Sequence, residues 1–86
     1  MRLLFTPYGR ADYTQWQTTE RAMVERINRL IDEALRDPST GLGKPEPLKH
    51  ALRGAWSRRI PDEHRLVYLV GDGDLVILQA RYHYGK

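Results

Sequence analysis

Residues 65–82 read RLVYLVGDGDLVILQARY, two apolar segments separated by the turn Gly71-Asp72-Gly73-Asp74. An Asp-Gly pair supplies the positive φ angles that a tight hairpin turn needs. The flanking segments are rich in β-branched and aromatic residues, which favour strands. The stretch therefore predicts two antiparallel strands, residues 65–70 and 75–82.

The alternation of side chains in these strands predicts which faces are buried. In the first strand both rows are largely apolar, as expected for a strand in the middle of a sheet. In the second strand one apolar row is expected to pack on the core, and it comprises Val76, Leu78, Ala80 and Tyr82. The other row is polar and contains Gln79, Arg81 and His83. We therefore expect one face of the sheet to be packed and the other to be exposed.

The chain upstream of this hairpin supplies one more strand and a loop. Residues 56–60 read as a strand that joins the hairpin through the turn Pro61-Asp62-Glu63-His64. Residues 38–47 hold three prolines and two glycines. That composition is typical of an ordered loop.

The first half of the chain predicts a short strand, residues 1–5, followed by two helices. Thr6 and Pro7 are a typical N-cap and first-turn proline for a helix of about ten residues. Thr18 and Thr19 are expected to interrupt this helix and cap the next one. The second helix has apolar residues at three- and four-residue steps, namely Met23, Ile27, Leu30, Ile31, Ala34 and Leu35, and it ends at Asp37-Pro38.

These elements together predict an α+β fold. Two N-terminal helices are expected to pack on one face of a mostly antiparallel sheet of four to five strands. At 86 residues the chain is expected to form a single domain, residues 1–86. The face of the sheet opposite the helices is then the expected functional surface.

Composition excludes several classes of protein. The chain has no cysteine, which excludes disulfides, thiol catalysis and cysteine-ligated metals. The spacing of His50, His64 and His83 matches no zinc pattern, so we expect neither a metal nor another cofactor. No apolar run is long enough for a membrane span or a secretory signal, and we therefore expect a cytoplasmic protein without membrane contact.

Positive charge is concentrated in the second half of the chain. Residues 1–40 hold six basic and six acidic residues, whereas residues 41–86 hold eight basic and five acidic ones. Basic and aromatic residues alternate there and suit single-stranded RNA, although a solvated charged face is the other interpretation. The basic set is Lys49, Arg53, Arg58, Arg59, Arg65 and Arg81. Strand alternation predicts that Arg59, rather than Arg58, faces a phosphate.

Two residues are candidates for acid–base chemistry. Glu46 lies between Pro45 and Pro47, which stiffen the backbone on both sides, and a general base must be held in position. A solvated loop glutamate is the alternative interpretation. His83 has the side chain best suited to donate a proton near neutral pH, and a surface histidine near the chain end is its alternative.

Four segments together resemble the YoeB toxins of bacterial toxin–antitoxin modules, a branch of the RelE/ParE superfamily. They are GKPEPLKH at residues 43–50, WSRRI at 56–60, EHRLVY at 63–68 and ARYHY at 80–84. The resemblance implies a metal-independent, ribosome-dependent endoribonuclease that cuts mRNA in the A site of the 70S ribosome and inhibits translation. The products would carry 2′,3′-cyclic phosphate and 5′-OH ends.

The resemblance also implies a role for each site residue. Glu46 would be the general base for the ribose 2′-OH, and His83 would protonate the leaving 5′-oxygen. Arg65 would stabilise the phosphorane and Tyr84 would position the nucleotide. The remaining basic candidates for phosphate or RNA contact are Lys49, Arg59, Arg81, Lys44 and Arg53. Gly85-Lys86 extend the chain beyond Tyr84, where the family usually ends.

The partners are implied by the same resemblance. A YefM-type antitoxin would neutralise the toxin, and the two together would repress their operon, with operator DNA bound only through the antitoxin complex. Family members can form a homodimer through the helical side, but no apolar seam in this sequence decides between monomer and dimer. A non-catalytic RNA- or ribosome-binding protein and a ParE-like gyrase-directed toxin are the alternatives, and the set of Glu46, Arg65 and His83 argues against both.

Overall fold

The structure, a computed structural model, describes residues 1–48 and 53–82 and confirms the α+β fold. In chain order the elements are β1 (Arg2–Phe5), α1 (Pro7–Thr19), α2 (Arg21–Arg36), β2 (Glu46–Pro47), β3 (Ala55–Arg59), β4 (Arg65–Gly71) and β5 (Asp74–Gln79). The strands form one five-stranded sheet with the order β1-β5-β4-β3-β2. β1 runs parallel to β5 and the other neighbours are antiparallel, as predicted for a mostly antiparallel sheet.

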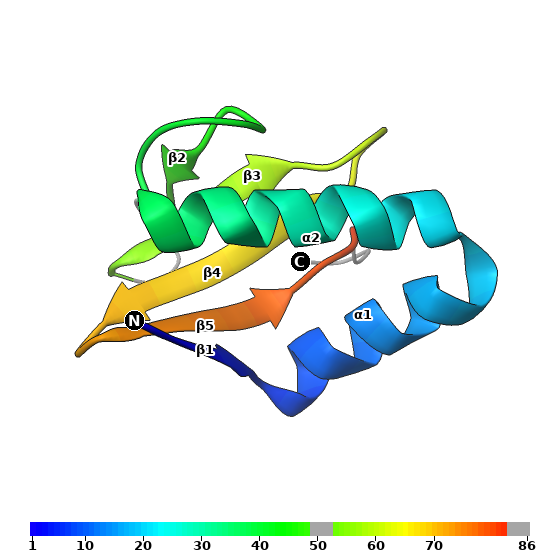
Figure 1. Ribbon diagram of the computed structural model, residues 1–86, viewed down its shortest axis with the longest axis horizontal. Coiled ribbons are helices and arrows are strands. Elements are labelled where there is room, and N and C mark those ends of the chain that lie inside the picture. The colour runs from blue at the N-terminus through cyan, green and yellow to red at the C-terminus, as the bar shows by residue number, and fades with distance from the viewer. Residues whose placement is uncertain (49–52, 83–86) are drawn as a thin grey trace.

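Both helices lie on the same side of the sheet, with α2 crossing in front of β3 and β4 and α1 beside the end of β5 (Figure 1). The predicted apolar stripe of α2 is buried at Met23, Ile27, Leu30, Ile31 and Ala34. It packs on the side chains that β4 and β5 turn toward the helices, namely Leu66, Tyr68, Leu75 and Ile77. No helix in the described part of the chain is long and apolar enough to cross a membrane.

α1 begins where the sequence predicts, but the way it ends differs from the prediction. The Thr6 hydroxyl accepts a hydrogen bond from the Gly9 amide at 2.9 Å, and Pro7 opens the first turn. Gly9 packs directly on β5, where any side chain would meet the Ile77 carbonyl. The predicted capping role of Thr18 and Thr19 is wrong. Both hydroxyls donate to the Gln15 carbonyl within α1, and α2 begins after Glu20 without a side-chain cap.

The central hairpin forms as predicted. Asp72 and Gly73 both have positive φ, +50° and +78°, and Gly71 pairs with Asp74 across the turn. β4 is the middle strand of the sheet, which explains why both of its side-chain rows are largely apolar. The sequence did not predict that Glu46 and Pro47 would pair with β3 as a short edge strand.

The predicted packing row of the last strand is wrong. Leu75 and Ile77 are fully buried, Val76 and Leu78 are half-buried, and Tyr82 is exposed. Val67 pairs with Gln79 and Tyr68 with Ile77, so Leu78 is an extra residue and the alternation changes phase there. Ala80 therefore joins Ile77 on the helix side, and the strand ends at Gln79 rather than Tyr82.

Candidate active site on the open face of the sheet

Glu46 lies on the face of the sheet opposite the helices. Its strand partner is Ser57, which in turn pairs with Val67, and Val67 pairs with Gln79. Directly paired residues point to the same side of a sheet. Because Val67 alternates with the buried Leu66 and Tyr68, this row points away from the helices. Glu46 stands at the β2 end of the row and is exposed.

Arg59 and Arg65 share this face with Glu46. They are directly paired between β3 and β4, and Arg59 is two residues from Ser57. Arg59 is exposed and Arg65 is half-buried. Within the described residues neither arginine forms an ion pair with a carboxylate. Two like charges placed opposite each other repel, so an anion bound between them would be stabilised by both guanidinium groups.

Arg58 points to the other side and is fully buried, which agrees with the prediction that Arg59 is the outward arginine. Its guanidinium donates to the Tyr68 hydroxyl through Nε at 2.9 Å and to the Leu42 carbonyl through Nη1 at 2.8 Å. Nη2 donates to the carbonyls of Asp37 and Thr40, each at 2.8 Å. The buried cation is thus held by polar groups of the loop after α2.

Tyr68 completes the anchoring of this loop. Its hydroxyl donates to the Pro38 carbonyl at 2.7 Å, and burial raises the pKa of the phenol, although the hydrogen bond from Arg58 opposes the shift. At the start of the loop, hydrogen bonds from Ser39 lower the pKa of the Asp37 carboxyl. The loop therefore follows a path that the sequence could not predict, since its carbonyls bind two side chains from β3 and β4.

The anchored loop leads directly to Glu46. The Gly43 carbonyl accepts the Arg59 amide at 2.6 Å, and Gly43 has a φ of +88°. Two residues later Pro45 begins the stiff Pro-Glu-Pro segment, which pairs with β3. Arg59 and Glu46 are thus both fixed by the backbone of the same loop and strand.

The other predicted basic residues do not gather as closely. Lys44 and Arg53 are exposed, in the loop before β2 and in the turn before β3. Arg81 binds α1 instead: its guanidinium donates to the Gln15 side chain and lies 6.0 Å from the centre of the Trp16 ring. The predicted site residues Lys49, His83 and Tyr84 lie outside the described residues.

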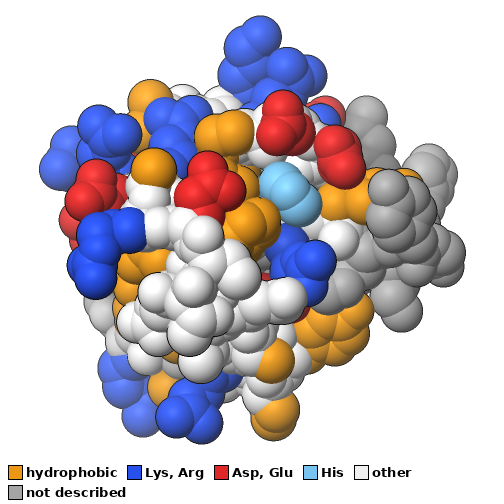
Figure 2. Space-filling model, turned by 90° about the vertical axis from the view of Figure 1, so that its right-hand side faces the viewer, with side chains coloured by type: hydrophobic (Ala, Val, Ile, Leu, Met, Phe, Trp, Pro, Cys, Tyr) orange, Lys and Arg blue, Asp and Glu red, His pale blue; other side chains and the backbone are white. Residues whose placement is uncertain are grey.

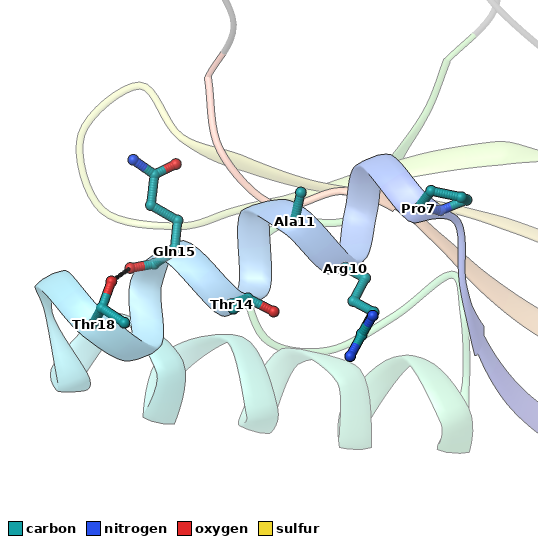
Figure 3. A pocket seen from close by; sticks show the side chains of 6 residues that line it. All are labelled: Pro7, Arg10, Ala11, Thr14, Gln15 and Thr18. Atoms are coloured by element: carbon teal, nitrogen blue, oxygen red, sulfur yellow. Dashed lines mark hydrogen bonds between the residues drawn. The ribbon is translucent and has the colours of Figure 1, made fainter.

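A surface hollow lies on α1, and Figure 3 shows the side chains around it. It is lined by Pro7, Arg10, Ala11, Thr14, Gln15 and Thr18. None of these is a predicted site residue. The candidate site is therefore the open sheet face around Glu46, Arg59 and Arg65 rather than this hollow.

Comparison with known proteins identifies the family. A sequence model described as "YoeB-like toxin of bacterial type II toxin-antitoxin system" matches residues 5–84. The chain belongs to the YoeB-like toxins. It is 58% identical to Toxin YoeB of Streptomyces coelicolor over 84 residues, which are 98% of this chain and 100% of that one.

Solved structures of YoeB toxins have the same fold as this chain. The YoeB/ParE toxin from Agrobacterium tumefaciens is 52% identical, with a TM-score of 0.90 over 98% of this chain and 100% of that one. Two structures from Staphylococcus aureus are 42% identical and cover 98% of both chains. One is a YoeB dimer with a TM-score of 0.88, and the other is a heterotetrameric YoeB-YefM complex with a TM-score of 0.89.

In this YoeB-like toxin, three side chains that were not among the predicted site residues help to hold the segment after β5. The buried Asp12 carboxylate accepts the Ala80 amide at 2.9 Å, and the Trp16 indole donates to the Ala80 carbonyl at 2.8 Å. His64 Nδ1 accepts the Tyr82 amide at 2.9 Å. Asp12 and Trp16 are four residues apart on α1, a spacing that places them on one helix face and was the signal available in the sequence.

Proposed function

We propose that this YoeB-like toxin is a ribosome-dependent, metal-independent endoribonuclease that cleaves mRNA in the A site. The observation that carries the proposal is the pair of facing arginines, Arg59 and Arg65, on the same sheet face as the exposed Glu46. A phosphodiester bound by the two guanidinium groups would lie on the surface that also presents a carboxylate. Family membership supports this reading of the geometry.

The proposed reaction is an internal transfer at phosphorus. Glu46 takes the proton from the ribose 2′-OH, whose oxygen attacks the adjacent phosphorus. The bond to the 5′-oxygen breaks, and His83 gives that oxygen a proton. The products are a 2′,3′-cyclic phosphate and a 5′-OH. Each proton transfer contributes about 10²–10⁴-fold to the rate.

The remaining residues bind and orient the RNA in this proposal. Arg65 stabilises the charge that builds on the phosphorane, an effect of a few kcal/mol. Arg59 and Lys49 hold the phosphate, and Tyr84 positions the nucleotide. Basic residues at the margins, Lys44, Arg53 and Arg81, would add contacts to the RNA backbone that weaken with salt.

The shape of the candidate site supports the proposed dependence on the ribosome. An open sheet face surrounds a flexible message on one side only and cannot orient it well. A message already threaded through the decoding site has lost much of this freedom before the toxin binds. The 70S ribosome is therefore a proposed partner, A-site mRNA is the proposed substrate, and the cytoplasm is the proposed location.

The proposed protein partner is a YefM-type antitoxin. YoeB-YefM complexes from Staphylococcus aureus support this assignment, and the YoeB dimer from the same organism supports a homodimer. An acidic antitoxin segment that orders over the basic face would neutralise it by charge pairing. Together the two proteins would repress their operon, with the antitoxin making the main DNA contacts.

The test is cleavage of an A-site message on purified 70S ribosomes in the presence of EDTA. Wild type should produce cyclic-phosphate and 5′-OH ends, and both Glu46→Gln and His83→Ala should lose them. Glu25→Gln, which changes an exposed carboxylate on α2, is the matched control and should cleave like wild type. An intact message with wild type would overturn the proposal in favour of a binding protein or a gyrase-directed toxin.

A further inference from the structure

The segment after β5 is held by side chains rather than by sheet hydrogen bonds. β5 ends at Gln79, and the following residue is fixed on both its amide and its carbonyl by Asp12 and Trp16. Two residues further on, the Tyr82 amide donates to His64 Nδ1 at 2.9 Å. The backbone of residues 80–82 is therefore held by these three side chains together with that of Gln79, whose Nε2 donates to the Arg81 carbonyl at 3.1 Å.

His64 is itself held through both its backbone carbonyl and its ring. The residue closes the β3–β4 turn, where its carbonyl accepts the Ile60 amide at 3.0 Å and Arg65 Nη1 at 2.9 Å. Its ring packs edge-on against Trp16, with ring centres 5.0 Å apart and an interplanar angle of 83°. Figure 2 shows a histidine on this side of the molecule, lying among hydrophobic, acidic and basic side chains.

We propose that His64 is a positioning residue for the cleavage reaction. By accepting the Tyr82 amide, it holds the backbone of the residue that directly precedes His83, the general acid of the proposed function on which this inference rests. Through its carbonyl it also contacts the Arg65 guanidinium. One residue thus contacts both the backbone that precedes the acid and the phosphate-binding arginine.

The contact works only with an unprotonated Nδ1. A neutral imidazole offers one acceptor nitrogen, whereas an imidazolium has two donors and no acceptor. Protonation of His64 would therefore set an N–H against the Tyr82 N–H and break the contact. Among the described residues, the charged groups near His64 include Asp62 and Glu63 of the same turn, its neighbour Arg65, and Arg81, whose guanidinium lies over the Trp16 ring.

Two substitutions separate this role from simple packing. His64→Asn places an amide oxygen near the position of Nδ1, whereas His64→Gln extends its amide to the position of Nε2. We expect the Gln variant to lose about tenfold or more in single-turnover cleavage on the ribosome, because a small displacement of a catalytic group is costly. The Asn variant should stay within about threefold of wild type, consistent with a retained hydrogen bond.

The pH profile and an NMR titration complete the test. The cleavage rate of wild type should fall when His64 is protonated, and the Asn variant should lack this part of the fall. In free wild-type protein, the Tyr82 amide resonance should titrate together with the His64 ring, and melting temperatures of both variants verify folding. Wild type that does not cleave overturns the proposed function and this role with it. If wild type cleaves but the Asn and Gln variants have the same rate, the role of His64 alone is overturned. A Tyr82 amide resonance that does not change when His64 is protonated has the same consequence.

Discussion

Replacing Tyr68 by Phe removes one buried hydroxyl and leaves the aromatic ring in the core. That hydroxyl donates to the Pro38 carbonyl at 2.7 Å and accepts from Arg58 Nε at 2.9 Å. Tyr68 is fully buried, as is Arg58. In the Phe variant the part-buried Pro38 carbonyl and the buried, charged Nε–H of Arg58 both lose a partner.

The expected cost follows from the two hydrogen bonds. A neutral hydrogen bond contributes about 1 kcal/mol and one from a charged donor about 1.5–3 kcal/mol, so the loss should be about 2–4 kcal/mol. The free energy of unfolding of an 86-residue domain is about 4–13 kcal/mol. The variant should therefore fold, with a melting temperature lowered by about 8–30 °C.

Tyr13→Phe is the matched control for this prediction. It deletes the same hydroxyl from a residue whose hydrogen bond, to Asn28 Oδ1 at 2.7 Å, is exposed to solvent. Water can replace that bond, so the loss should stay below about 1 kcal/mol. Urea denaturation of wild type and both variants gives the free energies of unfolding. Equal losses in the two variants would refute the idea that Arg58 and Tyr68 anchor the loop.

The consequence for the candidate site is measurable in the same variant. With residues 37–43 less firmly held, the hydrogen bond from the Arg59 amide to the Gly43 carbonyl should open more often. Hydrogen exchange at the Arg59 amide should accelerate more than that of amides in β5. Hydrogen exchange that accelerates evenly across the sheet would show global destabilisation. It would contradict the idea that the anchored loop locally stabilises the strands that carry Arg59 and Glu46.

Three further outcomes are expected. Gly9→Ala places a methyl group less than 3.0 Å from the Ile77 carbonyl oxygen, so α1 must shift. Urea denaturation should show that the free energy of unfolding falls by about 1–3 kcal/mol, and an unchanged value would contradict the close packing. Thr6→Ala removes the N-cap acceptor and should cost about 1 kcal/mol, while Thr6→Ser should restore most of it. Hydrogen bonds from Ser39 lower the pKa of the Asp37 carboxyl in the folded state. The ionised carboxylate therefore stabilises the fold above its ordinary pKa of 3.8, and this stabilisation is lost as the pH falls through the folded pKa. Melting temperatures measured from neutral to strongly acidic pH should therefore decline less steeply for Asp37→Asn than for wild type, and parallel curves would contradict this.

The fold could be predicted where local chemistry decides the structure. Asp72 and Gly73 require a tight turn, Thr6 and Pro7 start a helix, and the apolar stripe of α2 has one face to bury. Each of these signals acts within a few residues. Strand alternation likewise assigned the outward position to Arg59, because the β3 side chains from Ala55 to Arg59 pair with β4 without interruption.

Prediction failed where a partner distant in sequence decides the outcome. The extra residue at Leu78 exists because of how β5 pairs with β4, and nothing in the sequence of β5 alone marks it. Asp12 is buried because it meets the Ala80 amide, 68 residues away. For the candidate site, the sequence identified Glu46, Arg59 and Arg65 as individual residues, but only the sheet register shows that they share a face.

The contrasting environments of Arg58 and Arg59 explain how β3 supports a positive surface. Arg58 is buried, yet its partners are three loop carbonyls and a phenol rather than a carboxylate. Carbonyls satisfy the donors without cancelling the charge, so the strand keeps both positive charges. A buried Asp or Glu beside Arg58 would have formed a neutral pair beneath the sheet. The present arrangement instead rigidifies the loop before Glu46 and leaves the potential above Arg59 and Arg65 attractive to an anion.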